Sequence, residues 1–352
     1  MSSLTINKSS ISDLLEILKK VSANTQRDYT FFKIENNNIL IRSISNPMVF
    51  KYTLKEDLGI KASLDLFDFI KFLEMSIIYD NIEIKDSKNT ILIKTEKNKI
   101  KLSKKEEYDF SDIDDLLDRK EYAGTIRLED IDGILSICRN FNYGKSKDRS
   151  LSDRVRFDKG DCVATDGAFM LIFPIQFESS INLNVSDLPK ILKVFQDIND
   201  NINIYKVDNW NIFESGNIYY FTPQMEDSFP NYKSVFPDIK EYNSITINRN
   251  IFRDIIKEID SMMWVGLKTE NNDLVIYYVE DNRIEIENRI ELLQKNGVDI
   301  NIKMNPRKLY SILEFLDNDS VNIFYNPSNP SKSPVFIKDE SSRNCLIMCL
   351  SM

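Results

Sequence analysis

The residues with the most obvious chemical potential in this sequence form a dense run of carboxylates. They are Asp109, Asp112, Asp114, Asp115 and Asp118. Paired carboxylates can act as general acid and base, or they can bind a divalent metal ion. The chain contains no histidine, so the commonest acid–base group and triad member is missing. A run of like charges is also typical of a solvated linker between domains, and we favour that interpretation here.

The cysteines and the glycines give no stronger case for catalysis. The four cysteines are Cys138, Cys162, Cys345 and Cys349, and no pair has the spacing of a metal knuckle. Cys138 belongs to an apolar helix pattern, and Cys345 and Cys349 fall in the last predicted strand, so we expect buried, reduced thiols. Neither G-x-x-x-x-G-K-[ST] nor G-x-G-x-x-G occurs. The sequence therefore predicts a protein that is not an enzyme and that has no metal site and no cofactor.

Two helical patterns recur at a period of about 120 residues, which is the signature of a repeated fold unit. In each pattern apolar residues stand at i, i+3, i+4 and i+7, so they lie on one helix face. The first helix has Ile11, Leu14, Leu15 and Leu18, then Ile131, Ile134, Leu135 and Cys138, then Phe252, Ile255, Ile256 and Ile259. The second helix has Leu66, Phe69, Ile70 and Leu73, then Leu188, Ile191, Leu192 and Phe195, then Leu309, Ile312, Leu313 and Leu316.

Alternating or β-rich runs flank these helices in every repeat. They span residues 4–6, 125–128 and 244–247 before the first helix, and 81–85, 201–205 and 320–325 after the second. A half-buried sheet with two one-sided helices makes a two-layer α+β unit. We therefore predict an α+β protein of three repeated domains, at residues 1–120, 121–241 and 242–352, each with two helices packed on an antiparallel sheet.

Length and composition agree with several folded domains. The chain has 352 residues, more than the ~250 to 300 at which a single core stops growing. Its 42% hydrophobic and 29% charged residues are near the averages of globular proteins. No basic stretch leads into an apolar segment near the start, and no apolar run reaches ~18 residues. We therefore expect a cytoplasmic protein with no membrane partner.

Three local sequences resemble one protein family. They are V-A-T-D-G at residues 163–167, F-P-N-Y-K-S-V-F-P at 229–237 and L-I-M-C-L-S-M at 346–352. The chain resembles the bacterial-type DNA polymerase sliding clamp, the polymerase III β subunit family. The pattern of that family is an Ala-Thr-Asp-Gly turn, then Phe-Pro-Asp-Tyr running to Val-Leu-Pro, and finally a short apolar tail. Together with the threefold repeat, this resemblance covers the whole chain.

The resemblance implies a ring-forming fold and a role in DNA replication. Two three-domain subunits would close head to tail as a homodimer, with helices lining the hole and sheets on the outside. Double-stranded DNA would pass through the hole, held topologically and without sequence preference. The ring would be loaded by a clamp loader and would tether a replicative DNA polymerase for processive synthesis.

A ring of this kind needs basic residues on its helices, facing the phosphates. Those on the repeated helices are Lys19, Lys20, Lys71, Arg139, Lys190, Lys193, Arg249, Arg253, Lys257, Arg307 and Lys308. The family also places DNA contacts in loops that here hold Arg27, Lys145, Lys147 and Arg149. The chain as a whole has a formal charge of -9, and Glu16, Asp68, Asp132, Asp254 and Glu314 share these helices. Ordinary solvated helix faces therefore stay an alternative interpretation.

The resemblance also implies a cleft that accepts a short peptide from the polymerase, the clamp loader and repair proteins. The matching positions are Leu151, Thr165, Gly167, Ala168, Phe169, Met170, Pro230, Ser234, Val235, Leu346, Ile347, Met348 and Leu350. The alternative is that these residues only fill the core of a domain. An apolar run at the end of a chain is harder to explain as core.

The sequence departs from the family at this cleft. Ala168 and Phe169 replace a basic pair, and Ser234 replaces an arginine. Cys349 and Ser351 stand where the common tail has Pro and Arg. These changes remove most of the polar rim, so we predict that the cleft binds apolar or aromatic side chains. They also suggest a divergent clamp, such as one that a phage or plasmid encodes for its own polymerase.

Ring closure requires two different surfaces, one on the first domain and one on the third. Met262, Met263 and Trp264 are candidates for the third-domain side, because large apolar residues follow a helix where a turn is usually polar. The alternative is a buried helix end. Two other functions stay open for the whole chain, namely an interaction scaffold with the clamp fold and no role in replication, and a nucleic-acid enzyme whose metal-binding carboxylates meet only on folding.

Overall fold

The computed structural model of this protein describes residues 3–35, 37–45, 47–54, 58–79, 81–138, 154–196, 201–225, 229, 231–235, 239–280, 284–340 and 343–350. The chain forms two compact units. Unit 1 contains residues 1–128 and 186–225, and unit 2 contains residues 129–185 and 226–352. No helix in the described ranges is both long enough and apolar enough to cross a membrane.

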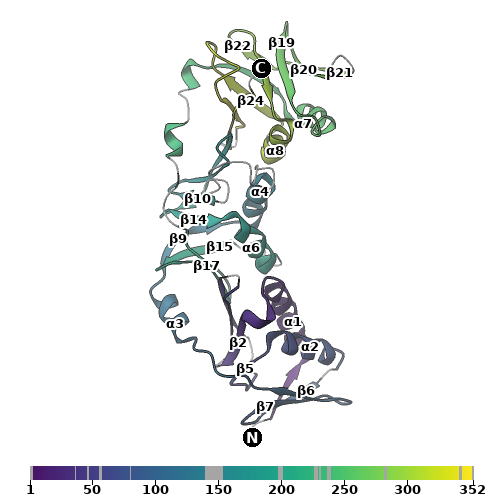
Figure 1. Ribbon diagram of the computed structural model, residues 1–352, viewed down its shortest axis with the longest axis vertical. Coiled ribbons are helices and arrows are strands. Elements are labelled where there is room, and N and C mark those ends of the chain that lie inside the picture. Colours follow the sequence, from purple (N-terminus) through teal and green to yellow (C-terminus); the bar gives the residue numbers. More distant parts are fainter. Residues whose placement is uncertain are drawn as a thin grey trace. The chain divides into compact units, whose positions relative to one another are not determined.

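Unit 1 contains four α-helices among its described residues, together with two antiparallel sheets (Figure 1). The helices are α1 (Lys8–Ser22), α2 (Leu66–Ser76), α3 (Ser111–Asp118) and α6 (Leu188–Phe195). The strands are β1 (Ser3–Asn7), β2 (Thr30–Glu35), β3 (Asn38–Ser43), β4 (Met48–Thr53), β5 (Ala62–Leu64), β6 (Asn81–Asp86), β7 (Thr90–Lys94), β8 (Lys99–Ser103), β9 (Glu121–Ile126), β15 (Ile202–Val207), β16 (Trp210–Ser215) and β17 (Ile218–Pro223).

The larger sheet of unit 1 runs across two of the predicted repeats. Its strands follow the order β9-β15-β16-β17-β4-β3-β2-β5, so the repeats join where β17 pairs with β4. That junction is largely apolar, with Tyr220 opposite Phe50 and Phe221 opposite Val49. The smaller sheet has the order β1-β6-β7-β8. Helix α1 packs against both α2 and α6, and Figure 1 shows α1 and α2 side by side.

Unit 2 has helices α4 (Leu128–Cys138), α7 (Arg249–Glu258) and α8 (Pro306–Phe315) in its described part. Its strands are β10 (Arg154–Asp158), β11 (Asp161–Thr165), β12 (Phe169–Pro174), β13 (Gln176–Phe177), β14 (Ile181–Asn184), β18 (Asn243–Asn248), β19 (Val265–Glu270), β20 (Asp273–Glu280), β21 (Ile284–Glu291), β22 (Gln294–Asn296), β23 (Asn301–Met304), β24 (Ser320–Tyr325), β25 (Val335–Lys338) and β26 (Asn344–Ile347).

The sheets of unit 2 repeat the plan of unit 1. The larger has the order β14-β10-β11-β12-β26-β25-β24-β18-β22, and the smaller has the order β21-β20-β19-β23. Two repeats join where β12 pairs with β26, with Phe169 opposite Ile347 and Met170 opposite Leu346. Helices α7 and α8 lie side by side, and they contact β18, β24 and β26 (Figure 1).

The six predicted helices are confirmed, and their starts follow ordinary capping chemistry. Asp65 Oδ1 accepts hydrogen bonds from the backbone N–H groups of Phe67 and Asp68 at the start of α2. Asn248 and Asn305 cap α7 and α8 in the same way, and Pro306 opens α8. The strands predicted before and after these helices are also present, as β1, β9 and β18 and as β6, β15 and β24.

All five carboxylates of the run are exposed, as a solvated segment predicts, but Asp112, Asp114, Asp115 and Asp118 lie in a helix, α3, rather than in an irregular linker. Helix α3 packs Ile113 and Leu116 into a core cluster with Val49, Phe110 and Phe221. Two of its exposed carboxylates form salt bridges. Asp112 pairs with Arg42 and Asp114 pairs with Lys51, each at 2.6 Å. The apolar residues at every third position, and not the density of charge, indicate that this segment is helical.

The cysteines are free thiols in the described structure. Cys138, Cys162 and Cys345 are buried, as predicted. Cys349 lies beyond the end of β26 rather than in the last strand, and it is half-buried, with its Sγ 3.3 Å from the Pro330 carbonyl oxygen. Burial raises the pKa of the Cys349 thiol to about 11, which keeps it protonated and unreactive.

Candidate functional site

The turn between β11 and β12 is built by the side chains of its own motif. Gly167 has φ +83°, a left-handed conformation that favours glycine. Thr165 Oγ1 donates to the Phe169 carbonyl oxygen at 2.7 Å and accepts from the Gly167 N–H at 3.1 Å. Asp166 Oδ1 accepts from the N–H groups of Ala168 and Phe169 at 3.1 and 2.9 Å. The motif therefore fixes the turn before any partner binds.

A buried ion pair ties this turn to helix α8. Lys308 Nζ lies 2.5 Å from Asp166 Oδ2, and the two side chains are only 7% and 2% exposed. Both side chains are almost completely excluded from solvent, so the electrostatic attraction between them is screened little by water. Lys308 therefore positions the turn, and it does not present its charge to the surface that we predicted to face DNA.

The end of the chain lies beside the turn. After β26 pairs with β12, the Met348 N–H donates to the Ala168 carbonyl oxygen at 2.9 Å. The Leu350 N–H then donates at 2.8 Å to the Lys303 carbonyl oxygen in β23. These two bonds hold the tail against the larger and the smaller sheet of unit 2, so its apolar side chains have a defined place.

The motif segment near residue 232 is anchored by its tyrosine. Tyr232 is buried in a cluster with Val163, Met170, Ile172 and Leu346. Its hydroxyl lies 3.2 Å from Asp158 Oδ2 and 3.1 Å from Asp161 Oδ2, so its proton can be donated to either carboxylate. Burial and these two negative charges raise the pKa of Tyr232 well above its ordinary value. The motif segment that contains Tyr232 is thereby fixed to the hairpin of β10 and β11.

Asp158 has a strongly lowered pKa at this anchor. Burial alone would raise it, but hydrogen bonds from Ser180 and the Lys159 N–H, the charge of Arg156 and the Tyr232 hydroxyl together lower it to about 2. The carboxylate is therefore charged at all physiological pH values.

The residues predicted to form the peptide cleft fall into three groups. Thr165, Phe169, Met170, Leu346 and Ile347 are buried, at 1 to 6% exposure, and fill the core around the β12–β26 junction. Gly167, Ala168, Ser234, Val235, Met348 and Leu350 are exposed, with Val235 at 44%, Met348 at 37% and Leu350 at 36%. Leu151 and Pro230 lie outside the described residues. The structure thus brings the exposed turn and the tail together over a common apolar core.

The basic residues on the repeated helices differ greatly in solvent exposure and in whether a carboxylate or carbonyl oxygen is bound to them. Lys71, Lys193 and Lys257 are exposed and have no carboxylate partner in the described part of the chain. Lys19 and Lys190 are bound to Glu74 and Asp187, each at 2.6 Å. Lys20 is only 9% exposed and pairs with Glu16 at 2.8 Å. Arg307 is exposed, and its Nε donates to the Asp260 carbonyl oxygen at 3.3 Å.

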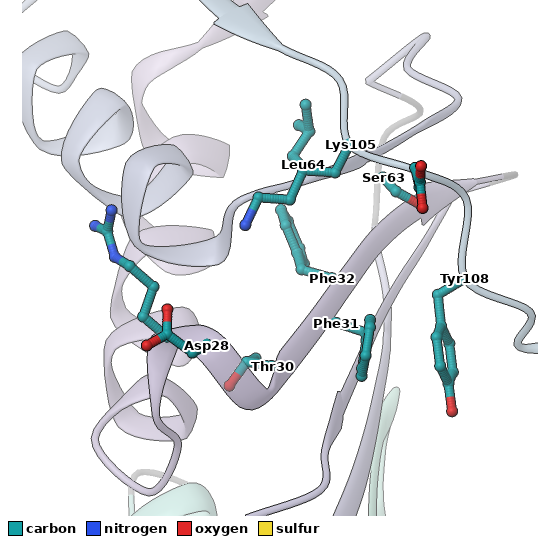
Figure 2. Close-up of a pocket in the computed structure, with 10 residues that line it drawn as sticks. Asp28, Thr30, Phe31, Phe32, Ser63, Leu64, Lys105 and Tyr108 are labelled. Atoms are coloured by element: carbon teal, nitrogen blue, oxygen red, sulfur yellow. The ribbon is translucent and has the colours of Figure 1, made fainter.

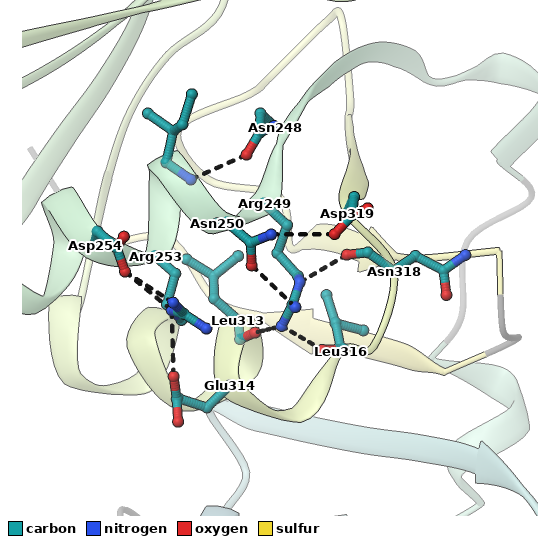
Figure 3. A network of polar contacts seen from close by, with 11 residues as sticks. Asn248, Arg249, Asn250, Arg253, Asp254, Leu313, Glu314, Leu316, Asn318 and Asp319 are labelled. Carbon is teal, nitrogen blue, oxygen red and sulfur yellow. Dashed lines mark hydrogen bonds and ion pairs between the residues drawn. The ribbon is translucent and has the colours of Figure 1, made fainter.

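Arg249 is a structural residue rather than a surface cation, as Figure 3 shows. It is 9% exposed, and its guanidinium donates to the carbonyl oxygens of Leu313 at 2.8 Å, Leu316 at 2.5 Å and Asn318 at 2.7 Å. These carbonyl groups end helix α8, where no intrahelical donor is available. Arg249 therefore caps α8 from α7. Arg253, on the next turn, is 30% exposed and pairs with Asp254 and Glu314 (Figure 3).

The loop cations are only partly placed. Arg27 is half-exposed and pairs with Asp68 at 3.2 Å and Asp65 at 3.9 Å. The remaining predicted DNA contacts, Arg139, Lys145, Lys147 and Arg149, lie outside the described residues.

Two edge strands have complementary charges that the sequence analysis missed. Strand β8 exposes Lys99 and Lys101 and half-buries Ile100 and Leu102 between them. Strand β21 exposes Glu285, Glu287, Arg289 and Glu291 in the same alternation. Each strand ends its four-stranded sheet. The signal was present as K-I-K-L-S and I-E-I-E, two alternating runs of opposite sign.

The predicted dimer residues lie in the loop that leads into β19. Met263 is 78% exposed, the highest value among the large exposed apolar side chains of the described residues. Trp264 is half-buried and packs against Tyr277 and Tyr278, with ring centroids 5.9 and 5.1 Å away, and Lys303 Nζ lies 4.0 Å from its ring. A rigid apolar surface of this kind, at a place where a loop is usually polar, is typical of a contact site.

The described residues contain no group of three or more His, Cys, Asp or Glu side chains that could hold a metal ion.

Comparisons with known proteins point to one family. No family model matches the chain. The beta sliding clamp of Staphylococcus epidermidis is 25% identical over 202 residues, which cover 53% of this chain and 52% of that protein. The chain thus matches about half the length of this curated relative.

Solved structures match over nearly the whole length. The DNA polymerase sliding clamp of Bacillus subtilis has a TM-score of 0.78 at 16% identity and covers 99% of both chains. The Helicobacter pylori beta clamp bound to a DNA ligase peptide has a TM-score of 0.76 at 16% identity and covers 100% of both chains. The likeness to these structures shows a shared fold.

Proposed function

We propose that this chain, a divergent member of the bacterial DNA sliding clamp family, closes as a homodimeric ring around duplex DNA and tethers a replicative polymerase for processive synthesis. The proposed repeats are residues 1–120, 121–241 and 242–352. A clamp loader would open the ring on DNA. The proposal assigns the chain no catalytic step and no cofactor, and it includes the expected cytoplasmic location.

The observation that carries the proposal is a regular pairing of strands between repeats. Each proposed repeat contributes two three-stranded meanders, and each meander ends in its third strand. These terminal strands are β4 and β8 in the first repeat, β12 and β17 in the second, and β21 and β26 in the third. Strand β4 pairs with β17, and β12 pairs with β26. Among the described residues, β21 and β8 are then the two terminal strands that pair with no strand of another repeat.

A second copy of the chain would supply the pairing partners that these two strands lack. Strand β21 of one subunit would pair with β8 of the other, and the reverse pair would close the ring. Antiparallel pairing would place Ile100 and Leu102 on the same face as Ile286, and Lys99 and Lys101 on the face of Glu285 and Glu287. The unpaired backbone of both edges would be satisfied at the same time.

Charge exchange between the two edge strands tests ring closure. Changing Lys99 and Lys101 to Glu should convert the dimer to a monomer in sedimentation velocity at low salt, because four glutamates would then face one another. Changing Glu285 and Glu287 to Lys should do the same, and the variant with all four changes should recover the dimer. Lys88→Glu, in the exposed turn of the same sheet, is the matched control. A four-fold variant that stays monomeric would contradict this pairing.

The proposed DNA face consists of the exposed cations on the repeated helices. Lys71, Lys193 and Lys257 are its main members, with Lys19, Arg253 and Arg307 beside carboxylates or carbonyl oxygens. Few free cations give weak, salt-sensitive contacts with phosphates and no sequence information, which suits a ring that must slide. The buried Lys20, Arg249 and Lys308 are not part of this face.

Retention on DNA of different topology tests the encircling role. A ring loaded on nicked circular DNA should stay bound through gel filtration and should leave when the circle is cut to a linear form. Changing Lys71, Lys193 and Lys257 together to Glu should reduce loading while leaving the dimer intact. Equal retention on linear and circular DNA would contradict encirclement. A folded dimer with no DNA retention would instead favour the scaffold without a replication role.

The proposed partner site is the exposed apolar surface made by the turn at Ala168, the segment at Val235 and the tail at Met348 and Leu350. It lacks cations at the positions where basic residues are usual, so its partner should anchor through large apolar side chains. The solved Helicobacter pylori relative is described as bound to a DNA ligase peptide, which supports a peptide role for this surface. Two anchors at ~1.5 to 3 kcal/mol each supply about 3 to 6 kcal/mol before the cost of association, so these anchors alone support a Kd no tighter than tens of micromolar, on the order of 50 µM.

Peptide titration tests this site. Peptides from the C-terminal tail of the cognate polymerase should bind wild type and should lose ~tenfold in affinity to Met348→Ala, since about one buried apolar side chain is removed. Ile251→Ala, an exposed apolar residue on helix α7, is the control and should bind like wild type. Unchanged affinity in Met348→Ala, or a strong dependence on an acidic residue in the peptide, would place the site elsewhere.

A further inference from the structure

Unit 1 contains a cavity that none of the proposed roles uses. It has a volume of about 400 Å³ and opens between the start of β2, strand β5 and residues 105–108 (Figure 2). Its apolar lining comes from Phe31, Phe32, Leu64 and Tyr108. The rings of Phe31 and Tyr108 stack with centroids 4.0 Å apart and an interplanar angle of 24°. A preformed wall of this kind accepts a flat ring, and the volume is enough for one large aromatic side chain and its neighbour.

One buried polar group in this lining has no partner. Ser63 is 7% exposed, and its Oγ makes no hydrogen bond in the described structure. The carbonyl oxygen of Ser63, by comparison, accepts a hydrogen bond from the Lys105 N–H at 2.9 Å. An orphaned hydroxyl in a cavity wall destabilises the fold unless a ligand completes it. A ring that carries its own N–H or O–H donor would do so.

The free charges around the cavity are negative. Arg27 and Lys105 both lie at the rim, but each is bound to Asp65, and Arg27 is also bound to Asp68. Asp28 and Glu106 line the same cavity, are exposed, and have no cationic partner in the described part of the chain. Around this opening two cations face four carboxylates, so the site disfavours a phosphate and favours a cationic ligand.

Two exposed apolar side chains come from segments next to the cavity. Tyr29 is 52% and Ile44 is 57% exposed, and the two are joined because the Ile44 N–H donates to the Tyr29 carbonyl oxygen at 3.0 Å. Tyr29 lies between the lining residues Asp28 and Thr30 in sequence. These side chains offer apolar contacts to residues that flank the ring in a short extended segment.

We propose that this cavity is a second docking site, which binds a linear peptide carrying a tryptophan or tyrosine flanked by lysine or arginine. The ring lies against the Phe31–Tyr108 wall, on the face of the sheet that Ser63 shares with Phe31, and its N–H or O–H donates to Ser63 Oγ. The flanking cations lie against Asp28 and Glu106. The site is in unit 1, whereas the proposed tail site is in unit 2, and it requires neither DNA nor ring closure.

Fluorescence anisotropy with two designed probes tests the proposal on the full chain. The probe Gly-Lys-Trp-Lys-Gly, labelled with fluorescein, should bind at low salt with a Kd of ~10 to 100 µM. The probe Gly-Glu-Trp-Glu-Gly should bind at least ~tenfold more weakly. Equal binding of the two probes, or preference for the acidic one, would overturn the assignment of the rim.

Variants of the lining separate binding from folding. Ser63→Ala should weaken the basic probe ~fivefold while leaving the thermal unfolding midpoint equal or higher, because it removes an orphaned hydroxyl. Changing Asp28 and Glu106 to Lys should weaken the probe ~tenfold or more, and Glu96→Lys, an exposed turn residue of the same unit, should have no effect. Unchanged affinity in Ser63→Ala and in the Asp28 and Glu106 variant would overturn the proposal. Binding of a short oligothymidylate that is lost in an Arg27→Ala, Lys105→Ala variant would do so as well, since the cavity would then be a nucleic-acid site.

Discussion

The buried pair of Lys308 and Asp166 gives the sharpest test of how the structure positions its functional surface. Lys308→Met removes the ammonium group and keeps a flexible apolar side chain of similar length. The Asp166 carboxylate then remains inside unit 2 without the ammonium group of Lys308. Because the side chains are 7% and 2% exposed, water cannot replace the lost partner without opening the turn.

The expected loss of stability follows from what remains around Asp166. Removing one member of a buried ion pair usually costs ~3 to 5 kcal/mol. Here Asp166 Oδ1 still accepts two backbone N–H groups, which compensate part of the charge, so we expect about 3 kcal/mol, the lower end of that range. In the double variant Lys308→Met, Asp166→Asn the amide oxygen can keep both hydrogen bonds and no charge is buried. Its loss should therefore be only about 1 kcal/mol.

Tryptophan fluorescence can read unit 2 by itself. The chain has 2 tryptophans, and Trp264 lies in unit 2 while Trp210 lies in unit 1. In a Trp210→Phe background, the fluorescence change of Trp264 in guanidinium chloride reports the unfolding of unit 2 without assuming that both units unfold together. Lys257→Met is the matched control, because Lys257 is exposed and unpaired, and its effect should stay within about 0.5 kcal/mol.

Two results would refute this reasoning. One is a loss below about 1 kcal/mol in Lys308→Met, which would mean that the carboxylate reaches water easily. The other is a double variant as unstable as the single one, because the damage would then come from lost packing rather than from an unpaired charge. The affinity for the polymerase-tail peptide should fall together with stability, since the turn at Ala168 is part of the proposed partner site.

Three further variants test the contacts around this surface. Arg249→Lys loses the fork that caps helix α8 and should destabilise unit 2 by about 2 to 3 kcal/mol in the same fluorescence assay. Tyr232→Phe removes the hydroxyl that donates to Asp158 or Asp161 and should cost about 1.5 kcal/mol, read in the same way. The pKa of Asp158 is about 2 in the folded chain against an ordinary 3.8, so its stabilisation is complete above pH 3.8 and is lost as the pH falls towards 2. The stability difference between wild type and Asp158→Asn should therefore shrink over that pH interval in acid titrations.

Periodicity allowed the sequence to predict the six repeated helices and the strands beside them. A stripe such as Phe252, Ile255, Ile256 and Ile259 fixes both the type of element and the face it buries, because the apolar residues have no other place to go. Residues 111–118 show the limit of composition, because their carboxylates indicate a linker whereas the spacing of Ile113 and Leu116 indicates a helix. A helix with two apolar residues and a charged outer face has the same composition as a linker, and only the spacing distinguishes them.

The candidate sites were harder to predict, because exposure depends on partners that are distant in sequence. Arg249 and Lys257 both lie on helix α7, and nothing local separates them. The structure buries Arg249 because the end of α8 offers three carbonyl oxygens, 64 to 69 residues away, and it leaves Lys257 in solvent. A basic residue on a predicted helix is therefore a candidate for phosphate contact only after its carboxylate and carbonyl neighbours are known.

The balance of charge on the proposed DNA face favours topological retention over affinity. Among the predicted DNA-facing residues that the structure describes, Lys71, Lys193 and Lys257 combine exposure on a repeated helix with the absence of a carboxylate partner. Two subunits would offer about six such cations, which corresponds to a salt slope of only about −5 if every one met a phosphate. The formal net charge of each chain is −9, so at longer distances the protein as a whole repels the DNA phosphates and opposes even that attraction. A protein with this balance would leave open DNA at moderate salt, so its persistence on a circle would have to come from the closed strand pairing of β8 with β21.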